Sequence, residues 1–296
     1  MTVTATESTF EEATIERLLA QGYRYQHGST IDRSPQSVIL LPELRAYLQR
    51  RYRHLPAHAI EQAIDLIRSP EGVNLERRNL TFHRLLRSGF DLRYEVDNEA
   101  HFEHIYLADF AQPDLNDWLV VNQLAIESSD GGNARRPDLI IYLNGLPVVL
   151  FELKSPWDSY ADVAGAHNQL GHYRIDIPQL FTFNCFCVIS DGKTTLHGMA
   201  DSSFEWYAPW KSIDGVSVEA NTTGTMKTLI EGLFPKERLL DYLRNFIVHE
   251  VVNDKLTKKG AKYHQFFAVR FATRRAVAAM APELMIPSYG HDISWP

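Results

Sequence analysis

The chain has 296 residues and a formal net charge of −7, with 45% hydrophobic and 23% charged residues. These proportions are near the averages for globular proteins, so they exclude a wholly disordered chain and a coiled-coil or collagen-like rod. The acidic balance argues against a protein that coats nucleic acid through bulk electrostatic attraction.

The first part of the chain predicts helices. Residues 10–21 carry apolar side chains at helical spacing and end before Gly22, a common helix terminator. Three further helices are expected at residues 42–54, 56–68 and 73–88. Residues 41–90 contain nine arginines against five acidic residues, a local balance of +4 that leaves the rest of the chain at −11. This predicts a basic helical lobe that could meet phosphate on one face, and a solvated arginine-rich helix surface is the alternative.

After Gly89 the pattern changes to that of strands. We expect strands at residues 91–96, 102–107, 117–127, 137–143, 147–153, 183–190 and 194–198, with a helix at 158–175. Asn144-Gly145 between two apolar runs is a strong hairpin signal. Strands flanked by helices predict an α/β fold around a central mixed sheet.

The last part of the chain is less regular. Residues 206–225 predict a loop, and 235–248 and 262–280 predict helices. The charged stretch at 253–260 is a candidate domain boundary, which divides the chain into a domain at 1–250 and a linker with the start of another domain at 251–296. The final residues, 282–296, lack periodicity, as expected of a chain that stops before its last domain is complete.

The composition also bears on the compartment. Cys185 and Cys187 are separated by one residue, so a disulfide between them would close a strained loop. No apolar run approaches the roughly 20 residues of a membrane span, and the first residues lack the basic and apolar regions of a signal peptide. We expect a cytoplasmic protein with no membrane partner.

The predicted hairpin carries the residues that indicate chemistry. Asp138 precedes one strand, and Glu152 and Lys154 end the next. Because side chains alternate along a strand, Glu152 and Lys154 share a face while Leu153 points into the core. The Asn-Gly turn brings Asp138 back beside them. Two carboxylates with room for water suit Mg²⁺, which can activate a water molecule against a phosphodiester, and the lysine can stabilise the developing negative charge.

These residues resemble a known family. Pro137-Asp138 and Glu152-Leu153-Lys154 resemble the PD-(D/E)xK nuclease motif, and Gln169 and Tyr173 resemble the QxxxY motif of its RecB-like branch. The sequence from 136 to 154 is similar to the N-terminal region of the restriction (R) subunit of type I restriction–modification enzymes. The sequence from 262 to 270 resembles the segment that leads into the helicase motor of that subunit. The resemblance implies a restriction-endonuclease-like core.

The resemblance also implies roles for single residues. Asp138 and Glu152 would be metal ligands and Lys154 the catalytic lysine, while Gln169 and Tyr173 would support the site or contact the DNA backbone.

Three further positions complete the expected site. The family places a carboxylate on the first helix, for which Glu11, Glu12 and Glu16 are candidates. We prefer Glu11, because it shares the core-facing side of that helix. Arg135 and Arg136 are either phosphate contacts or a solvated pair.

The family couples cleavage of unmodified foreign DNA to ATP-driven translocation, and the implied partners are double-stranded DNA and the methylation (M) and specificity (S) subunits. A phosphate loop needs G-x-x-x-x-G-K-[ST]. At Gly192-Lys193-Thr194 the position of the first glycine is held by Cys187. We therefore expect that ATP is needed only by the full-length subunit and is not bound by this chain.

Other interpretations stay open at this point. Asp138, Glu152 and Lys154 could form a structural salt bridge. A zinc site could be suggested by three histidine pairs, His54 and His58, His101 and His104, and His167 and His172. No cysteine pair or His-Glu-x-x-His pattern accompanies them. The chain could be a non-catalytic module for DNA binding or assembly of the restriction complex, or a nuclease of the same fold that acts in repair or transposition.

Overall fold

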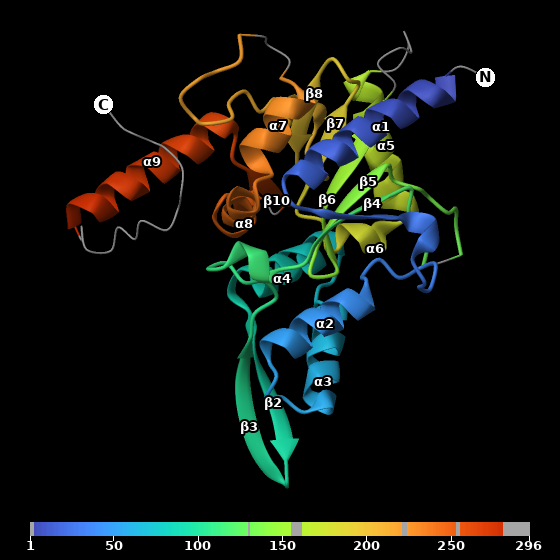
Figure 1. The fold of residues 1–296 in the computed structure, drawn as a ribbon. Coiled ribbons are helices and arrows are strands. Elements are labelled where there is room, and N and C mark those ends of the chain that lie inside the picture. The colour runs from blue at the N-terminus through green and yellow to red at the C-terminus, as the bar shows by residue number, and fades with distance from the viewer. Residues whose placement is uncertain (1–2, 130, 155–161, 221–223, 253–254, 281–296) are drawn as a thin grey trace.

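We describe the chain from a computed structural model, in which residues 3–129, 131–154, 162–220, 224–252 and 255–280 are described. A six-stranded sheet lies at the centre, in the order β1-β4-β5-β6-β7-β8, with helices around it (Figure 1). The predicted α/β fold with a central mixed sheet is confirmed, and it is consistent with a restriction-endonuclease-like core. Among the described residues no helix is both long and apolar enough to cross a membrane.

The helices of the described residues agree broadly with the sequence patterns. They are α1 (Val3–Ala20), α2 (Leu41–Arg51), α3 (Ala57–Arg68), α4 (Leu75–Ser88), α5 (Val163–Asp176), α6 (Pro178–Phe181), α7 (Met226–Leu233), α8 (Lys236–Asn245) and α9 (Tyr263–Met280). The strands are β1 (Arg24–His27), β2 (Phe90–Val96), β3 (Glu99–Ile105), β4 (Trp118–Asn122), β5 (Leu139–Leu143), β6 (Leu146–Leu153), β7 (Phe186–Ser190), β8 (Thr195–Gly198), β9 (Ile247–Val252) and β10 (Lys255–Gly260).

The predicted Asn-Gly hairpin lies in the middle of the sheet. Asn144 and Gly145 both have positive φ, 52° and 79°, as a tight turn between β5 and β6 requires. All residues of β5 and β6 are buried, because both strands lie inside the sheet and helices pack against its two faces. β6 pairs with β7 in parallel, and β1 pairs with β4 in parallel, whereas the other pairs are antiparallel. The sheet is therefore mixed.

Helices pack against both faces of the central sheet. α1 contacts β1, β6 and α7, and α5 contacts β6 and β7. In Figure 1, α1 crosses the near side of the sheet and α5 lies behind it. The six-stranded sheet thus forms the middle layer of the body, in which β5 and β6 are fully buried and the edge strand β1 is largely exposed.

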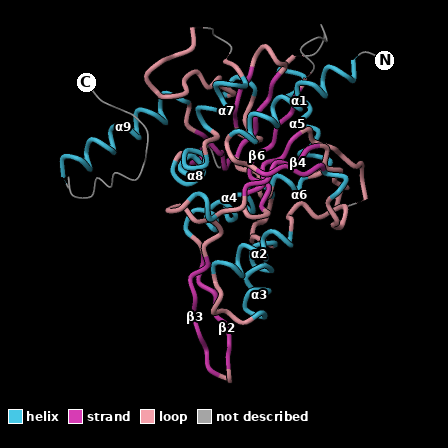
Figure 2. Tube along the Cα trace, in the orientation of Figure 1, coloured by secondary structure: helices cyan, strands magenta, loops and turns pink. Residues whose placement is uncertain are grey.

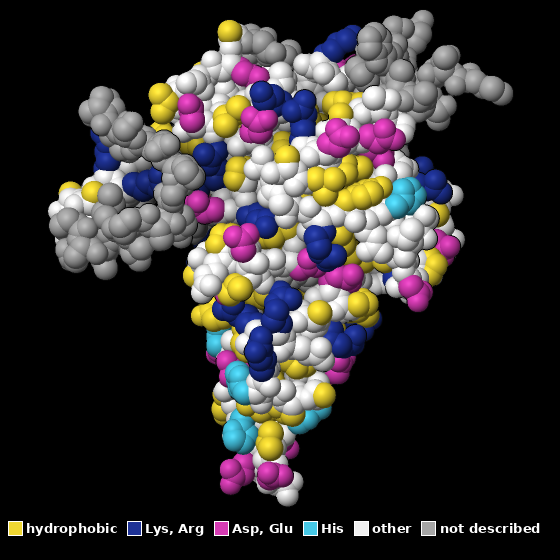
Figure 3. Space-filling model, in the orientation of Figure 1, with side chains coloured by type: hydrophobic (Ala, Val, Ile, Leu, Met, Phe, Trp, Pro, Cys, Tyr) yellow, Lys and Arg dark blue, Asp and Glu magenta, His cyan; other side chains and the backbone are white. Residues whose placement is uncertain are grey.

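A second part of the fold projects from this body. The predicted helices of the basic lobe are confirmed as α2, α3 and α4, and β2 and β3 form a separate hairpin that extends beside α3 (Figure 2). The hairpin turns at Asp97 and Asn98, which both have positive φ. In Figure 3 Lys and Arg side chains gather where the lobe meets the body, whereas Asp, Glu and His side chains mark the hairpin tip.

Several elements differ from the sequence patterns. The strand expected at 117–127 ends at Asn122, because Gln123 has a φ of 52° that no strand residue adopts. Residues 226–233, expected in no element, form α7, whose first turn is capped by Thr225. The helix expected at 158–175 begins at Val163, and its first residues fall in 155–161, outside the described residues.

The charged stretch expected to be a linker differs most. Residues 255–260 form β10, which pairs antiparallel with β9. Lys258 of this strand is buried at 6% exposure, and its Nζ donates to Asn79 Oδ1 of α4 at 3.0 Å. A linker exposes its charges, whereas this stretch packs against the body. The assignment of 251–296 to a linker and the start of another domain stays a prediction.

Candidate active site

The three charged residues of the predicted motif meet at one edge of the sheet. Leu139 of β5 is paired with Phe151 of β6, so Asp138, just before β5, lies opposite Glu152. The backbone N–H of Leu153 donates to Asp138 Oδ2 at 2.7 Å. Lys154 Nζ lies 2.6 Å from Glu152 Oε1. The expected convergence of two carboxylates and an ammonium group is present, and Leu153 points into the core at 0% exposure.

Burial gives this group unusual electrostatics. Glu152 is 2% exposed, and charged side chains are rarely buried without a partner. Burial and then the negative charge of Glu152 raise the pKa of Asp138 to about 8, against the opposing effects of the Leu153 N–H and Lys154. Two neighbouring carboxylates repel each other when both are ionised. A divalent cation bound between them would offset this repulsion.

Glu11 of α1 reaches the same edge of the sheet. It is 7% exposed and accepts hydrogen bonds from Asn122 Nδ2 and Gln123 Nε2, each at 2.6 Å. The same Gln123 amide lies 3.4 Å from Asp138 Oδ1. Of the three glutamates considered on the first helix, Glu11 is thus the one that the fold links to Asp138, and the link passes through Gln123.

Gln123 and Asn122 were missed by the sequence reasoning. They follow a buried strand and belong to no recognised motif, so the only signal was a pair of amides at the end of an apolar run. Their importance follows from the positive φ of Gln123, which turns its side chain from the strand towards the two carboxylates.

The helix pair Gln169 and Tyr173 also lies at the site. Both are on α5, and Tyr173 is 4% exposed. Burial, then the charges of Glu152 and Asp138, raise the pKa of the Tyr173 hydroxyl. The hydroxyl also lies 3.5 Å from Arg136 O. Tyr173 is therefore close to both carboxylates and to the segment that leads into Asp138.

The two arginines before Asp138 have different surroundings. Arg135 is held by Asp176 at the end of α5, with 2.6 Å between Nε and Oδ2. Arg136 is exposed. Arg135 thus ties the strand entry to α5, whereas the side chain of Arg136 stays accessible to an anion.

The donor set fits a hard divalent cation better than zinc. Asp138 and Glu152 supply carboxylate oxygens, which Mg²⁺ prefers, and Mg²⁺ commonly needs only one or two carboxylates with water and substrate phosphate. Within the described parts of the chain no group of three or more His, Cys, Asp or Glu side chains could hold a metal ion. Cys185 and Cys187 are buried, and burial raises the pKa of each thiol to about 12, so neither offers a thiolate.

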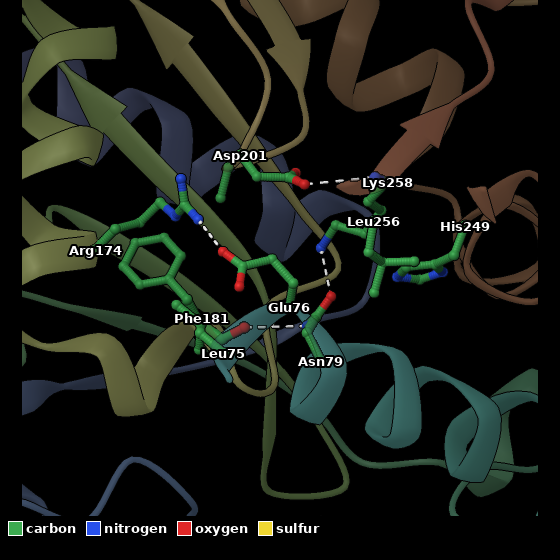
Figure 4. A pocket seen from close by; sticks show the side chains of 10 residues that line it. Leu75, Glu76, Asn79, Arg174, Phe181, Asp201, His249, Leu256 and Lys258 are labelled. Carbon is green, nitrogen blue, oxygen red and sulfur yellow. Dashed lines mark hydrogen bonds and ion pairs between the residues drawn. The ribbon is translucent and has the colours of Figure 1, made fainter. Parts of the chain in front are cut away.

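A separate pocket lies away from these carboxylates, between α4, α5 and the β9–β10 hairpin (Figure 4). Its volume is about 20 Å³, room for little more than one water molecule. Arg174 pairs with Glu76 across it at 3.0 Å, and Lys258 bonds Asn79. The first contact joins α5 to α4 and the second fastens the hairpin to α4, and the space is too small for an organic ligand.

Comparison with known proteins gives a consistent result. The family model described as "Type I restriction enzyme R protein N terminus" matches residues 4–206. The chain is 34% identical over 284 residues to the type I restriction enzyme HindI endonuclease subunit of Haemophilus influenzae, covering 92% of this chain and 27% of that protein. It is 29% identical over 293 residues to the putative type I restriction enzyme MjaIXP endonuclease subunit of Methanocaldococcus jannaschii, covering 91% and 28%. The chain thus spans about a quarter of the length of these relatives.

Proposed function

The chain belongs to the family of type I restriction enzyme R protein N-terminal regions, as the resemblance predicted, and from this premise we propose that it hydrolyses phosphodiesters of unmodified double-stranded DNA. Its relatives are named endonuclease subunits. The observation that carries the proposal is the meeting of Asp138, Glu152 and Lys154 at one sheet edge, with a backbone bond that holds Asp138 in place.

Mg²⁺ is the cofactor that the donor set suits. Asp138 and Glu152 would hold the ion, which when bound polarises the scissile phosphate and lowers the pKa of a water molecule. Lys154 places its ammonium group beside Glu152, where it can orient the attacking water and stabilise negative charge on the phosphate oxygens. Leu153 N–H fixes Oδ2 of Asp138, and Oδ1 lies 3.4 Å from the Gln123 amide.

The surrounding residues position these groups. Tyr173 of α5 lies close to the charges of Glu152 and Asp138, and Glu11 accepts a hydrogen bond from the Gln123 amide that lies against Asp138. Restricting rotamers in this way preserves the geometry that catalysis requires. No residue among these reads a base sequence.

The activity of the whole enzyme goes beyond this chain. We propose that sequence specificity comes from the S subunit and assembly from the M subunit, and that ATP drives translocation in a motor that follows this region in the full-length subunit. The turn at Gly192-Lys193-Thr194 lies between β7 and β8 with no helix after it, which supports the expectation that ATP is not bound here.

A non-catalytic module for DNA binding or assembly is the second candidate function, and the lobe at 41–90 would be its binding surface. Arg51 is paired with Asp109, Arg45 with Glu61, and Arg50 donates to Leu115 O. Because the charges of Arg51 and Arg45 are offset by carboxylates within the fold, the lobe offers less positive charge to DNA than its nine arginines suggest. We therefore rank this function below the nuclease.

Mg²⁺-dependent nicking of supercoiled plasmid at low salt tests the proposed nuclease, with Lys154→Ala compared with the wild type. We expect the variant to lose at least about 100-fold of the activity, because it lacks the charge that stabilises the transition state. The same substitution in the complete enzyme complex should abolish DNA cleavage while ATP hydrolysis continues. Cleavage retained by Lys154→Ala in the complex would refute the proposal.

A further inference from the structure

The edge of the sheet that holds the carboxylates extends beyond them to β7. β6 and β7 run parallel, with Leu153 paired to Ser190, so both strands end at this edge. The backbone N–H of Lys154 donates to Ser190 O at 2.7 Å. The turn after β7 therefore lies directly beside the catalytic lysine.

This turn is held in one shape by its own polar groups. Asp191 Oδ1 accepts hydrogen bonds from the backbone N–H groups of Lys193 and Thr194, at 2.9 and 2.7 Å. The N–H of Gly192 donates to Ser190 Oγ at 3.1 Å, and its φ of 79° suits glycine. The backbone bonds are thus made inside the turn, and the side chain of Lys193 is exposed.

Exposed cations consequently flank the carboxylates on both sides. Arg136 precedes β5 and Lys193 follows β7, with the end of β6 between them. In the described part of the chain neither takes part in an ion pair, in contrast to Arg135, which is held by Asp176. Because Asp191 Oδ1 is engaged by two backbone N–H groups, it competes weakly for the Lys193 ammonium group.

We propose that one DNA strand crosses this edge of the sheet from Arg136 to Lys193, and that Lys193 contacts a phosphate next to the one cleaved. Neighbouring strands of a sheet are about 4.8 Å apart, so the ends of β5 and β7 are separated by roughly 10 Å. A DNA strand carries one phosphate per about 3.4 Å of helix axis, and successive phosphates are farther apart along the strand itself, so this separation spans neighbouring phosphates of one strand. The inference rests on the proposed function, because it takes the carboxylates as the point of cleavage.

The chemistry of Lys193 suits a contact that ignores sequence. Its ammonium group is a compact charge on a flexible stem, which binds phosphate without the fixed geometry of a base contact. Each such contact displaces counterions from DNA, so its loss lowers both the affinity and the dependence of affinity on salt.

Equilibrium binding tests the path without any cleavage. The affinity of the 296-residue chain for a short fluorescent DNA duplex is measured in EDTA at several NaCl concentrations. Lys193→Ala should weaken binding several-fold and reduce the slope of log affinity against log salt by about one. Arg136→Ala should act in the same way, and the double variant should reduce the slope by about two, since the two contacts are independent.

Two variants serve as controls. Lys193→Arg keeps the charge and should keep the wild-type slope. Lys236→Ala removes one positive charge at the opposite edge, where Lys236 pairs with Asp114 ahead of β4, and should leave the slope unchanged.

The outcomes separate this inference from the nuclease proposal. A Lys193→Ala slope equal to that of Lys236→Ala overturns the path, and so does a wild-type chain that fails to bind the duplex at low salt. Neither result depends on Mg²⁺ or Lys154. Conversely, cleavage retained by Lys154→Ala overturns the nuclease proposal even where the binding results hold.

Discussion

Leu153 donates its backbone N–H to Oδ2 of Asp138 at 2.7 Å, across the pair of strands whose ends form the site. Because the donor is a backbone N–H group, it is present whatever side chains stand at positions 152 and 154. The bond fixes the Asp138 carboxylate without a contribution from the side chain of Glu152 or Lys154. Substitutions at those two positions can therefore change chemistry without moving Asp138.

Asp138→Asn should separate cleavage from stability. The amide oxygen can still accept from Leu153, so we expect the fold to persist, while a metal ligand becomes neutral and nicking falls by at least about 100-fold. In the wild type the folded pKa of Asp138 is raised to about 8, above the unfolded value of about 3.9. The contribution of Asp138 to stability is therefore fully present below the unfolded pKa and is lost as pH rises towards 8.

The asparagine variant lacks this loss. Without metal, urea unfolding from about pH 5 to about pH 8 should show a stability advantage of Asp138→Asn that grows with pH. An advantage that is constant or shrinks with pH would contradict the assigned environment of Asp138.

Gln123→Leu should weaken the link between α1 and the site. It removes the amide that donates to Glu11 at 2.6 Å and lies 3.4 Å from Asp138, which leaves a buried carboxylate with one donor fewer. We expect a loss of about 1–3 kcal/mol in the free energy of unfolding and a lower nicking rate. Gln62→Leu, at an exposed position on α3, is the matched control and should change neither quantity.

Tyr173→Phe should affect chemistry more than folding. The ring stays buried, but the site loses the hydroxyl that lies close to the charges of Glu152 and Asp138 and 3.5 Å from Arg136 O. We expect the unfolding free energy to fall by about 1 kcal/mol and nicking by about 10-fold, with little change in DNA affinity. A variant with wild-type nicking would show that the helix pair has no part in positioning Glu152.

Lys258→Ala tests how firmly the β9–β10 hairpin is fastened to the body. Burial lowers the pKa of Lys258, so the unfolded chain binds more protons below the ordinary lysine value of about 10.4 and stability rises as pH approaches it. The variant lacks this rise and leaves Asn79 Oδ1 without its donor. We expect a loss of about 3 kcal/mol that increases with pH, whereas Lys255→Ala at an exposed site should be nearly neutral.

Much of the fold was predictable because its signals are local. The helices of the lobe and the hairpin of β5 and β6 follow from periodicity and from Asn144-Gly145, which depend on residues a few positions apart. Residues 255–260 misled the same reasoning, because their charges are typical of a linker whereas Lys258 is stabilised by Asn79 of α4, 179 positions away.

By itself, the sequence determined that Glu152 and Lys154 share a face and that a tight turn returns Asp138 to them. Strand alternation and turn geometry are properties of the local backbone. Only the tertiary structure decided that Glu11 reaches Asp138 through Gln123, that Arg135 is held by Asp176 while Arg136 stays accessible, and that the turn with Lys193 follows a strand end beside Lys154. These relations join elements distant in sequence, and they arise from packing and strand order, which no short pattern encodes.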